Sequence, residues 1–129
     1  MTTVIDTTGM ARADWLELRR THITATDVAQ AATGYYGTLR TVVEDKLTPP
    51  DDDGPTDAMA RGLAAETPLV LAVEALTGLH VINRQLFARH PDRPEWACTL
   101  DGELAASPDG PPLAVAETKT RNQRVPVPA

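Results

Sequence analysis

Apolar residues in the first half of the chain recur every three to four positions, which is the repeat of an amphipathic helix. The repeat predicts one helix over residues 12–20 and a second from about residue 24 to 32. Either Thr24 or Thr26 can cap the second helix, because a threonine hydroxyl accepts hydrogen bonds from the first free amides. Gly34 is expected to end that helix, since glycine adopts the left-handed backbone of a helix C-terminus.

Two further helices follow from the same repeat. One is predicted over residues 38–47, and a long Ala- and Leu-rich helix over residues 56–76, ending at Gly78. Pro68 complicates the long helix, because proline lacks an amide proton and crowds the preceding turn. We therefore expect the helix to kink or restart beside Glu66.

Beyond residue 78 the pattern changes to short apolar runs bounded by turn-forming residues, which predicts strands. We expect strands over residues 81–87, 96–100 and 113–118, and interpret residues 1–10 as a tail or short turn. Helices followed by short strands are typical of an α/β protein of the α+β type, here with a mixed sheet of about three strands. Residues 1–129 are expected to form a single domain.

Composition narrows the class of protein. The 129 residues are 42% hydrophobic, enough for a core, and carry a formal net charge of −6, which argues against sequence-blind DNA binding through basic residues. Any DNA contact must then be local, or assisted by bound cations. A lone Cys98 excludes an intrachain disulfide and a Cys-rich zinc site. With neither a signal-peptide start nor a long apolar run, the expected location is the cytoplasm, without a membrane.

Candidate chemistry lies at the ends of two predicted strands. Asp101 follows one strand and the triplet Glu117-Thr118-Lys119 ends the next, so adjacent strands can bring them together. Alternation along a strand places Glu117 and Lys119 on one side, while Thr118 can offer its carbonyl. Two carboxylates and a carbonyl suit Mg²⁺ or Mn²⁺. The triplet alone is weak evidence, because exposed Glu–Lys pairs are common.

Five sequence blocks place the triplet in a larger context, and they occur in a fixed order between about residues 12 and 120. They are Trp15-Leu16-Glu17-Leu18-Arg19, then Ile23-Thr24-Ala25-Thr26-Asp27-Val28, then Met59 through Gly62 to Glu66 and Pro68, then Thr77-Gly78 with Val81, and finally Thr99-Leu100-Asp101-Gly102 with Glu117-Thr118-Lys119-Thr120. In this order they resemble the YqaJ-type viral recombinases, relatives of the bacteriophage lambda exonuclease within the PD-(D/E)xK nuclease superfamily. The ordered set is more specific than any single block.

The resemblance implies a PD-(D/E)xK, restriction-endonuclease-like core and a catalytic set. Glu66, Asp101 and Glu117 would bind Mg²⁺ or Mn²⁺, with the carbonyl of Thr118 as a further ligand, and Lys119 would be the catalytic lysine. The implied activity is a metal-dependent deoxyribonuclease, a 5′-to-3′ double-stranded DNA exonuclease used in phage-type recombination.

The resemblance also implies partners and a second site. Arg19 and Thr26 match positions that hold the 5′-terminal phosphate, and a guanidinium with a hydroxyl near a helix N-terminus suits an anion. A solvated helix arginine and an N-cap are the alternative roles of these two residues. The implied partners are double-stranded DNA ends, a single-strand annealing protein and further copies of the chain in a homo-oligomer.

The sequence departs from the family pattern in two places. Leu100 stands where members usually have proline before the aspartate, and residues 121–129 are short and Pro-rich where the family continues with helices and a further strand. The expectation is therefore the N-terminal two-thirds of the family domain, incomplete at its C-terminus. A second hypothesis follows: an inactive, truncated remnant that at most binds metal, DNA or a partner.

Overall fold

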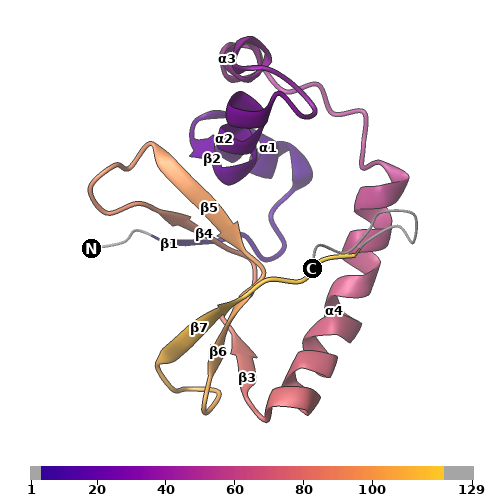
Figure 1. Ribbon diagram of the computed structural model, residues 1–129, viewed down its shortest axis with the longest axis vertical. Coiled ribbons are helices and arrows are strands. Elements are labelled where there is room, and N and C mark those ends of the chain that lie inside the picture. The colour runs from indigo at the N-terminus through magenta and orange to yellow at the C-terminus, as the bar shows by residue number, and fades with distance from the viewer. Residues whose placement is uncertain (1–3, 121–129) are drawn as a thin grey trace. The chain divides into compact units, whose positions relative to one another are not determined.

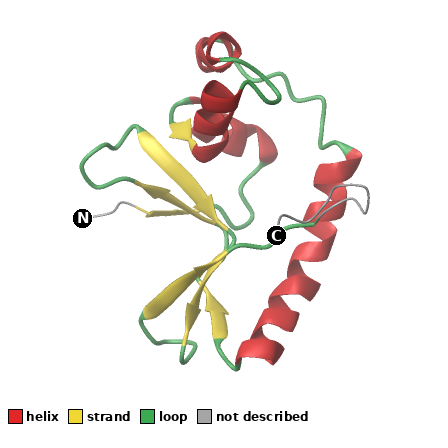
Figure 2. Ribbon diagram, viewed as in Figure 1, coloured by secondary structure: helices red, strands yellow, loops and turns green. Residues whose placement is uncertain are grey.

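The computed structural model describes residues 4–120, and these form an α+β protein, as the sequence predicts (Figure 1, Figure 2). The helices are α1 (Arg12–Arg20), α2 (Ala25–Thr33), α3 (Leu39–Leu47) and α4 (Asp57–Thr77). The strands are β1 (Val4–Asp6), β2 (Ile23–Thr24), β3 (His80–Ile82), β4 (Leu86–Arg89), β5 (Trp96–Leu100), β6 (Gly102–Ala105) and β7 (Pro112–Ala116). No helix within residues 4–120 is long and apolar enough to cross a membrane.

Helix α2 shows why the helical predictions agree closely with the structure. Thr24 is its N-cap: the Thr24 hydroxyl accepts from the amide of Asp27, and the Asp27 carboxylate accepts from the amide of Thr24. This capping box satisfies two amides that a helix start leaves unpaired. Gly34 ends α2 with a left-handed φ of 68°. Of the two threonines predicted as caps, Thr24 takes that role and Thr26 lies in the first turn.

Of the two outcomes expected at Pro68, a kink or a restart, the restart is wrong, because α4 is continuous through this residue. Residues 57–77 form one helix, with Thr56 accepting from the amide of Met59 at the start and Gly78 in the left-handed region at the end. Pro68 cannot donate to the carbonyl four residues before it. Twenty-one residues of helix with strong ends tolerate that one missing bond.

The strands are more numerous than predicted. The expected strand over residues 81–87 is two strands, β3 and β4, because the backbone turns at Asn83 and Gln85, whose φ angles are 51° and 58°. A positive φ on a residue other than glycine leaves no signal in hydrophobic alternation. Strands β1, β2 and β6 were not predicted, since each has only two to four residues. The described strands form a four-stranded and a three-stranded sheet in place of the single expected sheet.

The chain divides into two compact units. The first unit holds residues up to Asp53 and Gln85–Leu100. It contains α1 to α3 and a sheet of order β1-β4-β5-β2, in which β2 runs parallel to β5 and the other pairs are antiparallel. Phe87 is fully buried, and its ring meets that of His22 edge-on at 5.0 Å between centroids. The core of this unit therefore centres on β4.

The second unit holds Gly54–Arg84 and the chain from Asp101 onward. It contains α4 and an antiparallel sheet of order β3-β6-β7. Its buried side chains are small: Val70, Ala105 and Ala116. The carboxylate of Glu74 accepts the amide of Val81 at 2.9 Å, which ties the end of α4 to β3. The expectation of a single domain stays a prediction.

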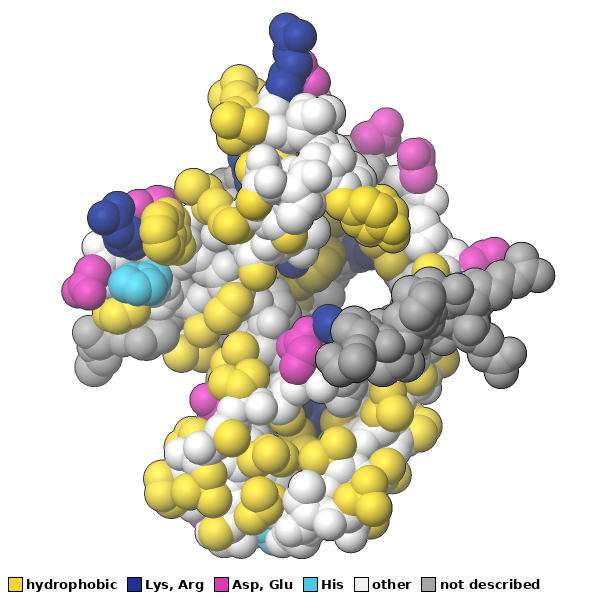
Figure 3. Space-filling view, viewed as in Figure 1, with side chains coloured by type: hydrophobic (Ala, Val, Ile, Leu, Met, Phe, Trp, Pro, Cys, Tyr) yellow, Lys and Arg dark blue, Asp and Glu magenta, His cyan; other side chains and the backbone are white. Residues whose placement is uncertain are grey.

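Many large apolar side chains remain exposed in both units, and Figure 3 shows hydrophobic side chains across the visible face. Leu63 and Leu71 on α4 are 72% and 60% exposed, and Leu113 and Val115 on β7 are 62% and 58% exposed. Few described hydrophobic residues are buried, so the described core is thin. Phe87 is the one large side chain that is fully buried among the described residues.

Candidate functional site

Asp101 contacts the predicted catalytic triplet inside the second unit. Strand β6 begins directly after Asp101 and pairs with β7 so that Gly102 lies opposite Ala116. This register places Asp101 beside the residues that follow β7. The amide and the hydroxyl of Thr118 both donate to Oδ2 of Asp101, at 2.7 Å and 3.0 Å. The pair of strands expected from the sequence is wrong, since β5 and β7 belong to different sheets and β6 provides the link.

Glu117 and Lys119 form an ion pair just beyond β7, between Oε1 of the glutamate and Nζ of the lysine. Their side chains are 49% and 69% exposed. Residues two apart on an extended chain point to the same side, which explains the pairing. The lysine is therefore accessible and has an acidic neighbour.

Glu66 lies on α4, and its side chain is 13% exposed, much less than the 49% of Glu117. Its Oε1 accepts a hydrogen bond from Nη2 of Arg84 at 3.2 Å. Arg84 comes from the turn between β3 and β4 and was not among the predicted site residues. The signal that could have found it is a basic residue interrupting an apolar run, flanked by Asn83 and Gln85.

Each of the three carboxylates already has a partner within the protein. Glu66 pairs with Arg84, Asp101 accepts hydrogen bonds from Thr118, and Glu117 pairs with Lys119. Within residues 4–120 no three acidic, histidine or cysteine side chains are grouped closely enough to hold one ion. The predicted donors, carboxylates and a carbonyl, fit Mg²⁺ or Mn²⁺ in kind. Binding one ion with all of them requires side chains to exchange their present partners.

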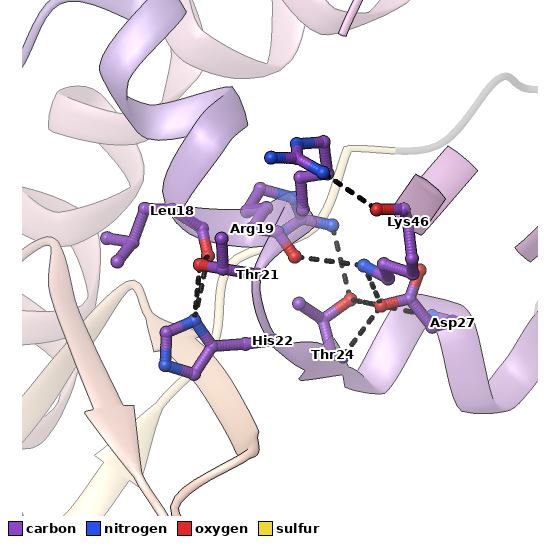
Figure 4. Close-up of polar contacts among 8 residues, drawn as sticks. Leu18, Arg19, Thr21, His22, Thr24, Asp27 and Lys46 are labelled. Atoms are coloured by element: carbon purple, nitrogen blue, oxygen red, sulfur yellow. Dashed lines mark hydrogen bonds and ion pairs between the residues drawn. The ribbon is translucent and has the colours of Figure 1, made fainter. Parts of the chain in front are cut away.

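Arg19, the first predicted phosphate ligand, lies in the first unit at the end of α1. Its guanidinium stacks on the ring of Trp15 at 4.8 Å. Its Nη2 donates to the hydroxyl of Thr24 at 3.5 Å, a contact drawn in Figure 4. Burial lowers the pKa of Arg19, and the charge of Asp27 acts in the opposite direction. Thr26, the second predicted ligand, is exposed in the first turn of α2, two residues beyond the threonine that Arg19 contacts.

Lys46 on α3 joins the same cluster. Its ammonium pairs with Oδ2 of Asp27 at 2.7 Å and donates to the carbonyl of Arg19 at 2.9 Å (Figure 4). Desolvation alone would raise the pKa of Asp27, but hydrogen bonds from Lys46 and Thr24 outweigh it and hold that pKa below its usual value. Sequence reasoning missed Lys46, because its position depends on how α3 packs against α2.

A pocket of about 400 Å³ opens beside this cluster. Its charged lining residues are the cations Arg19, Arg20 and Lys46 and the carboxylates Asp27, Asp45 and Asp51. Opposite charges balance in number, so the pocket as a whole does not attract anions by net charge. Any selectivity for phosphate would come from the individual donors of Arg19 and the start of α2.

The sequence profile of the YqaJ-like viral recombinase domain matches residues 14–127. No curated protein and no solved structure matches the chain. The matched range includes every predicted site residue, from Arg19 to Lys119, and spans most of the sequence. The chain therefore belongs to the family of the YqaJ-like viral recombinase domain.

Proposed function

We propose that this protein is a Mg²⁺-dependent deoxyribonuclease that degrades duplex DNA from 5′ ends during phage-type recombination. The observation that carries the proposal is the contact between Asp101 and Thr118, which joins the aspartate to the Glu117-Thr118-Lys119 triplet. Membership of a viral recombinase family supports the same activity.

The proposed roles follow from the chemistry of each residue. Glu66, Asp101, Glu117 and the carbonyl of Thr118 would hold Mg²⁺ or Mn²⁺. A bound divalent ion lowers the pKa of water and neutralises phosphate charge. Lys119, once released from Glu117, has an exposed ammonium that can hold a water molecule and stabilise negative charge on the phosphate.

Arg19 and Thr26 are proposed to hold the 5′-terminal phosphate. The Arg19 side chain is held by the Trp15 ring and the Thr24 hydroxyl, so its guanidinium loses little freedom on binding an anion. The exposed hydroxyl of Thr26 lies in the first turn of α2, where unpaired amides favour negative charge.

The activity test compares linear duplexes with 5′-phosphate ends, linear duplexes with 5′-hydroxyl ends, and closed circles, all with Mg²⁺. The expected result is fastest degradation of the 5′-phosphorylated duplex and intact circles. Lys119→Ala should retain Mn²⁺ binding and lose cutting, while Glu95→Gln, an exposed carboxylate near β5, should leave both unchanged. Equal cutting of circles would remove the exonuclease claim.

A non-catalytic binding module is the second candidate. It is favoured by one observation, that each of the three carboxylates already has a partner within the protein. Titration calorimetry of Mg²⁺ and Mn²⁺ into wild type and Asp101→Ala separates the two. Metal binding by wild type that is lost in Asp101→Ala supports the nuclease. If neither protein gives a heat of metal binding, the result supports the binding module.

The partners proposed with the nuclease are duplex DNA ends, a single-strand annealing protein and further copies of this chain. The support is family membership. Sedimentation velocity of the purified protein, alone and with a blunt duplex, measures the oligomeric state, and a monomer under both conditions would remove the oligomer from the proposal.

A further inference from the structure

The turn that carries Arg84 holds this residue against Glu66, one of the proposed metal ligands. Arg84 lies between Asn83 and Gln85, which both have left-handed backbones. The side chain of Asn83 donates to Glu103 on β6 at 2.7 Å, which fastens the turn to the sheet of the second unit. The position of Arg84 is thus set by the fold and not by a freely moving loop.

Gly102 allows this approach. A Cβ at Gly102 would lie 3.6 Å from Cγ of Arg84, so the stem of the arginine packs on the backbone next to Asp101. Its Nη2 reaches Glu66 on α4 at 3.2 Å. Arg84 therefore pairs with the proposed ligand on α4, while its stem lies against Gly102, the residue that follows the proposed ligand Asp101.

The bond from Arg84 to Glu66 is long for a charge-assisted hydrogen bond. In addition, Nε of Arg84 is buried and has no hydrogen-bond partner within the part of the chain that the structure describes. A buried donor without a partner costs free energy, which the arginine recovers by moving to a position where water or another acceptor reaches it. The pair is therefore one that a stronger ligand for Glu66 can displace.

We propose that Arg84 is an internal counter-cation of Glu66 that competes with a divalent metal ion for this carboxylate. This inference rests on the proposed function, because it takes Glu66 as a metal ligand. The guanidinium neutralises Glu66 in the metal-free protein and repels an incoming cation, so metal binding must separate the pair. Arg84 thereby lowers metal affinity and limits occupancy at low metal concentration.

The test is calorimetric titration of Mn²⁺ into the full chain, with no DNA present. Arg84→Gln removes the charge and should bind Mn²⁺ about fivefold more tightly than wild type, the size expected for one partly exposed charge pair. Arg84→Lys keeps the charge and should stay within about twofold of wild type. Arg93→Gln is the matched control, because it removes an arginine stacked on Trp96 in the first unit, and it should have no effect.

Glu66→Gln completes a double-mutant cycle. If the arginine acts through Glu66, Arg84→Gln should change Mn²⁺ affinity by less than about twofold in the Glu66→Gln background. Far-UV circular dichroism checks that each variant is folded. Should Arg84→Gln fail to fold, Arg84→Met keeps the aliphatic stem on Gly102 and takes its place.

Weaker or unchanged Mn²⁺ binding by folded Arg84→Gln would overturn this inference alone, provided that wild type binds Mn²⁺ and Glu66→Gln binds less. Binding by Arg84→Gln where wild type shows none would support the inference strongly. No binding by either protein would overturn both the inference and the proposed metal site.

Discussion

Gly102 is the position where a single methyl group should have the largest effect on the second unit. A Cβ there would lie 2.6 Å from Cγ1 of Val81 and 3.4 Å from the carbonyl oxygen of Ile82. Because the Ile82 carbonyl belongs to a paired strand, it cannot move aside at low cost. Gly102→Ala should lower the free energy of unfolding by about 1–3 kcal/mol, as overpacking does elsewhere. Urea denaturation followed by circular dichroism measures this change.

Gly62 provides the matched control for Gly102. It lies inside α4, and the nearest atom to a Cβ there is Oγ1 of Thr120 at 3.8 Å, an ordinary contact distance. Gly62→Ala should therefore raise the free energy of unfolding by about 0.5–1 kcal/mol, because alanine favours the helix. If Gly102→Ala and Gly62→Ala changed the free energy of unfolding in the same direction, the close contact at Gly102 would not explain the effect of Gly102→Ala.

Asp27 should make the first unit sensitive to acid. Its folded-state pKa is lowered, so its contribution to stability is present above the unfolded pKa and is lost as the pH falls through the folded pKa. Asp27→Asn should destabilise the protein at pH 7 by about 1 kcal/mol through loss of the charged hydrogen bond with Lys46. The difference from wild type should shrink below about pH 4.

Urea unfolding of wild type and Asp27→Asn at pH 7 and pH 3 measures this effect. Glu44→Gln is the control, because Glu44 lies on the exposed side of α3 and pairs only with Arg40 among the described residues. A stability difference between wild type and Asp27→Asn that is equal at both pH values would contradict the assignment.

Helices and strands differ in how far the sequence determines them. The ends of α2 and α4 were predictable because capping residues and glycines act over three or four neighbouring positions, as Thr24, Gly34 and Gly78 do. Strands depend on distant partners. The two residues of β2 form a strand only because β5 lies beside them, which no local pattern records.

Substitution of Pro68 tests how much this proline destabilises helix α4. An alanine at this position would supply the amide that the carbonyl of Ala64 lacks, so Pro68→Ala should raise the free energy of unfolding by about 1–3 kcal/mol. Thermal and urea unfolding measure it, with Pro55→Ala, which precedes the helix, as the control. A loss of stability in Pro68→Ala would mean that the packing of α4 depends on the proline.

At the scale of the whole molecule, the sequence indicated the side chains proposed for the site but not the partners that these side chains bind. Asp101 and the triplet could be matched by strand ends, since each follows a short apolar run. The pairing of Glu66 with Arg84 and of Lys46 with Asp27 depends on tertiary packing between separate elements. Residues 121–129, predicted to be a short Pro-rich end, lie outside the described residues.

The two units should unfold together. The chain passes from one unit to the other after Asp53, Arg84 and Leu100, so neither unit is a continuous segment that can separate freely. Trp15 and Trp96 both belong to the first unit, while α4, the longest described helix, belongs to the second. Tryptophan fluorescence and far-UV circular dichroism should therefore give the same urea midpoint. Different midpoints would show two independently stable parts and would contradict the single-domain prediction.

The pairing of β1 with β4 and of β2 with β5 also sets an order of events during synthesis. Ile5 pairs with Phe87, and Ile23 with Trp96, so both early strands wait for partners that the ribosome makes later. At about 5–20 residues per second, the delay is about 4–16 seconds. An unpaired strand is a template for wrong pairing with other chains. Strand β1 has three residues and β2 has two. The unpaired strands of the nascent chain are therefore too short to pair extensively with other molecules during that interval.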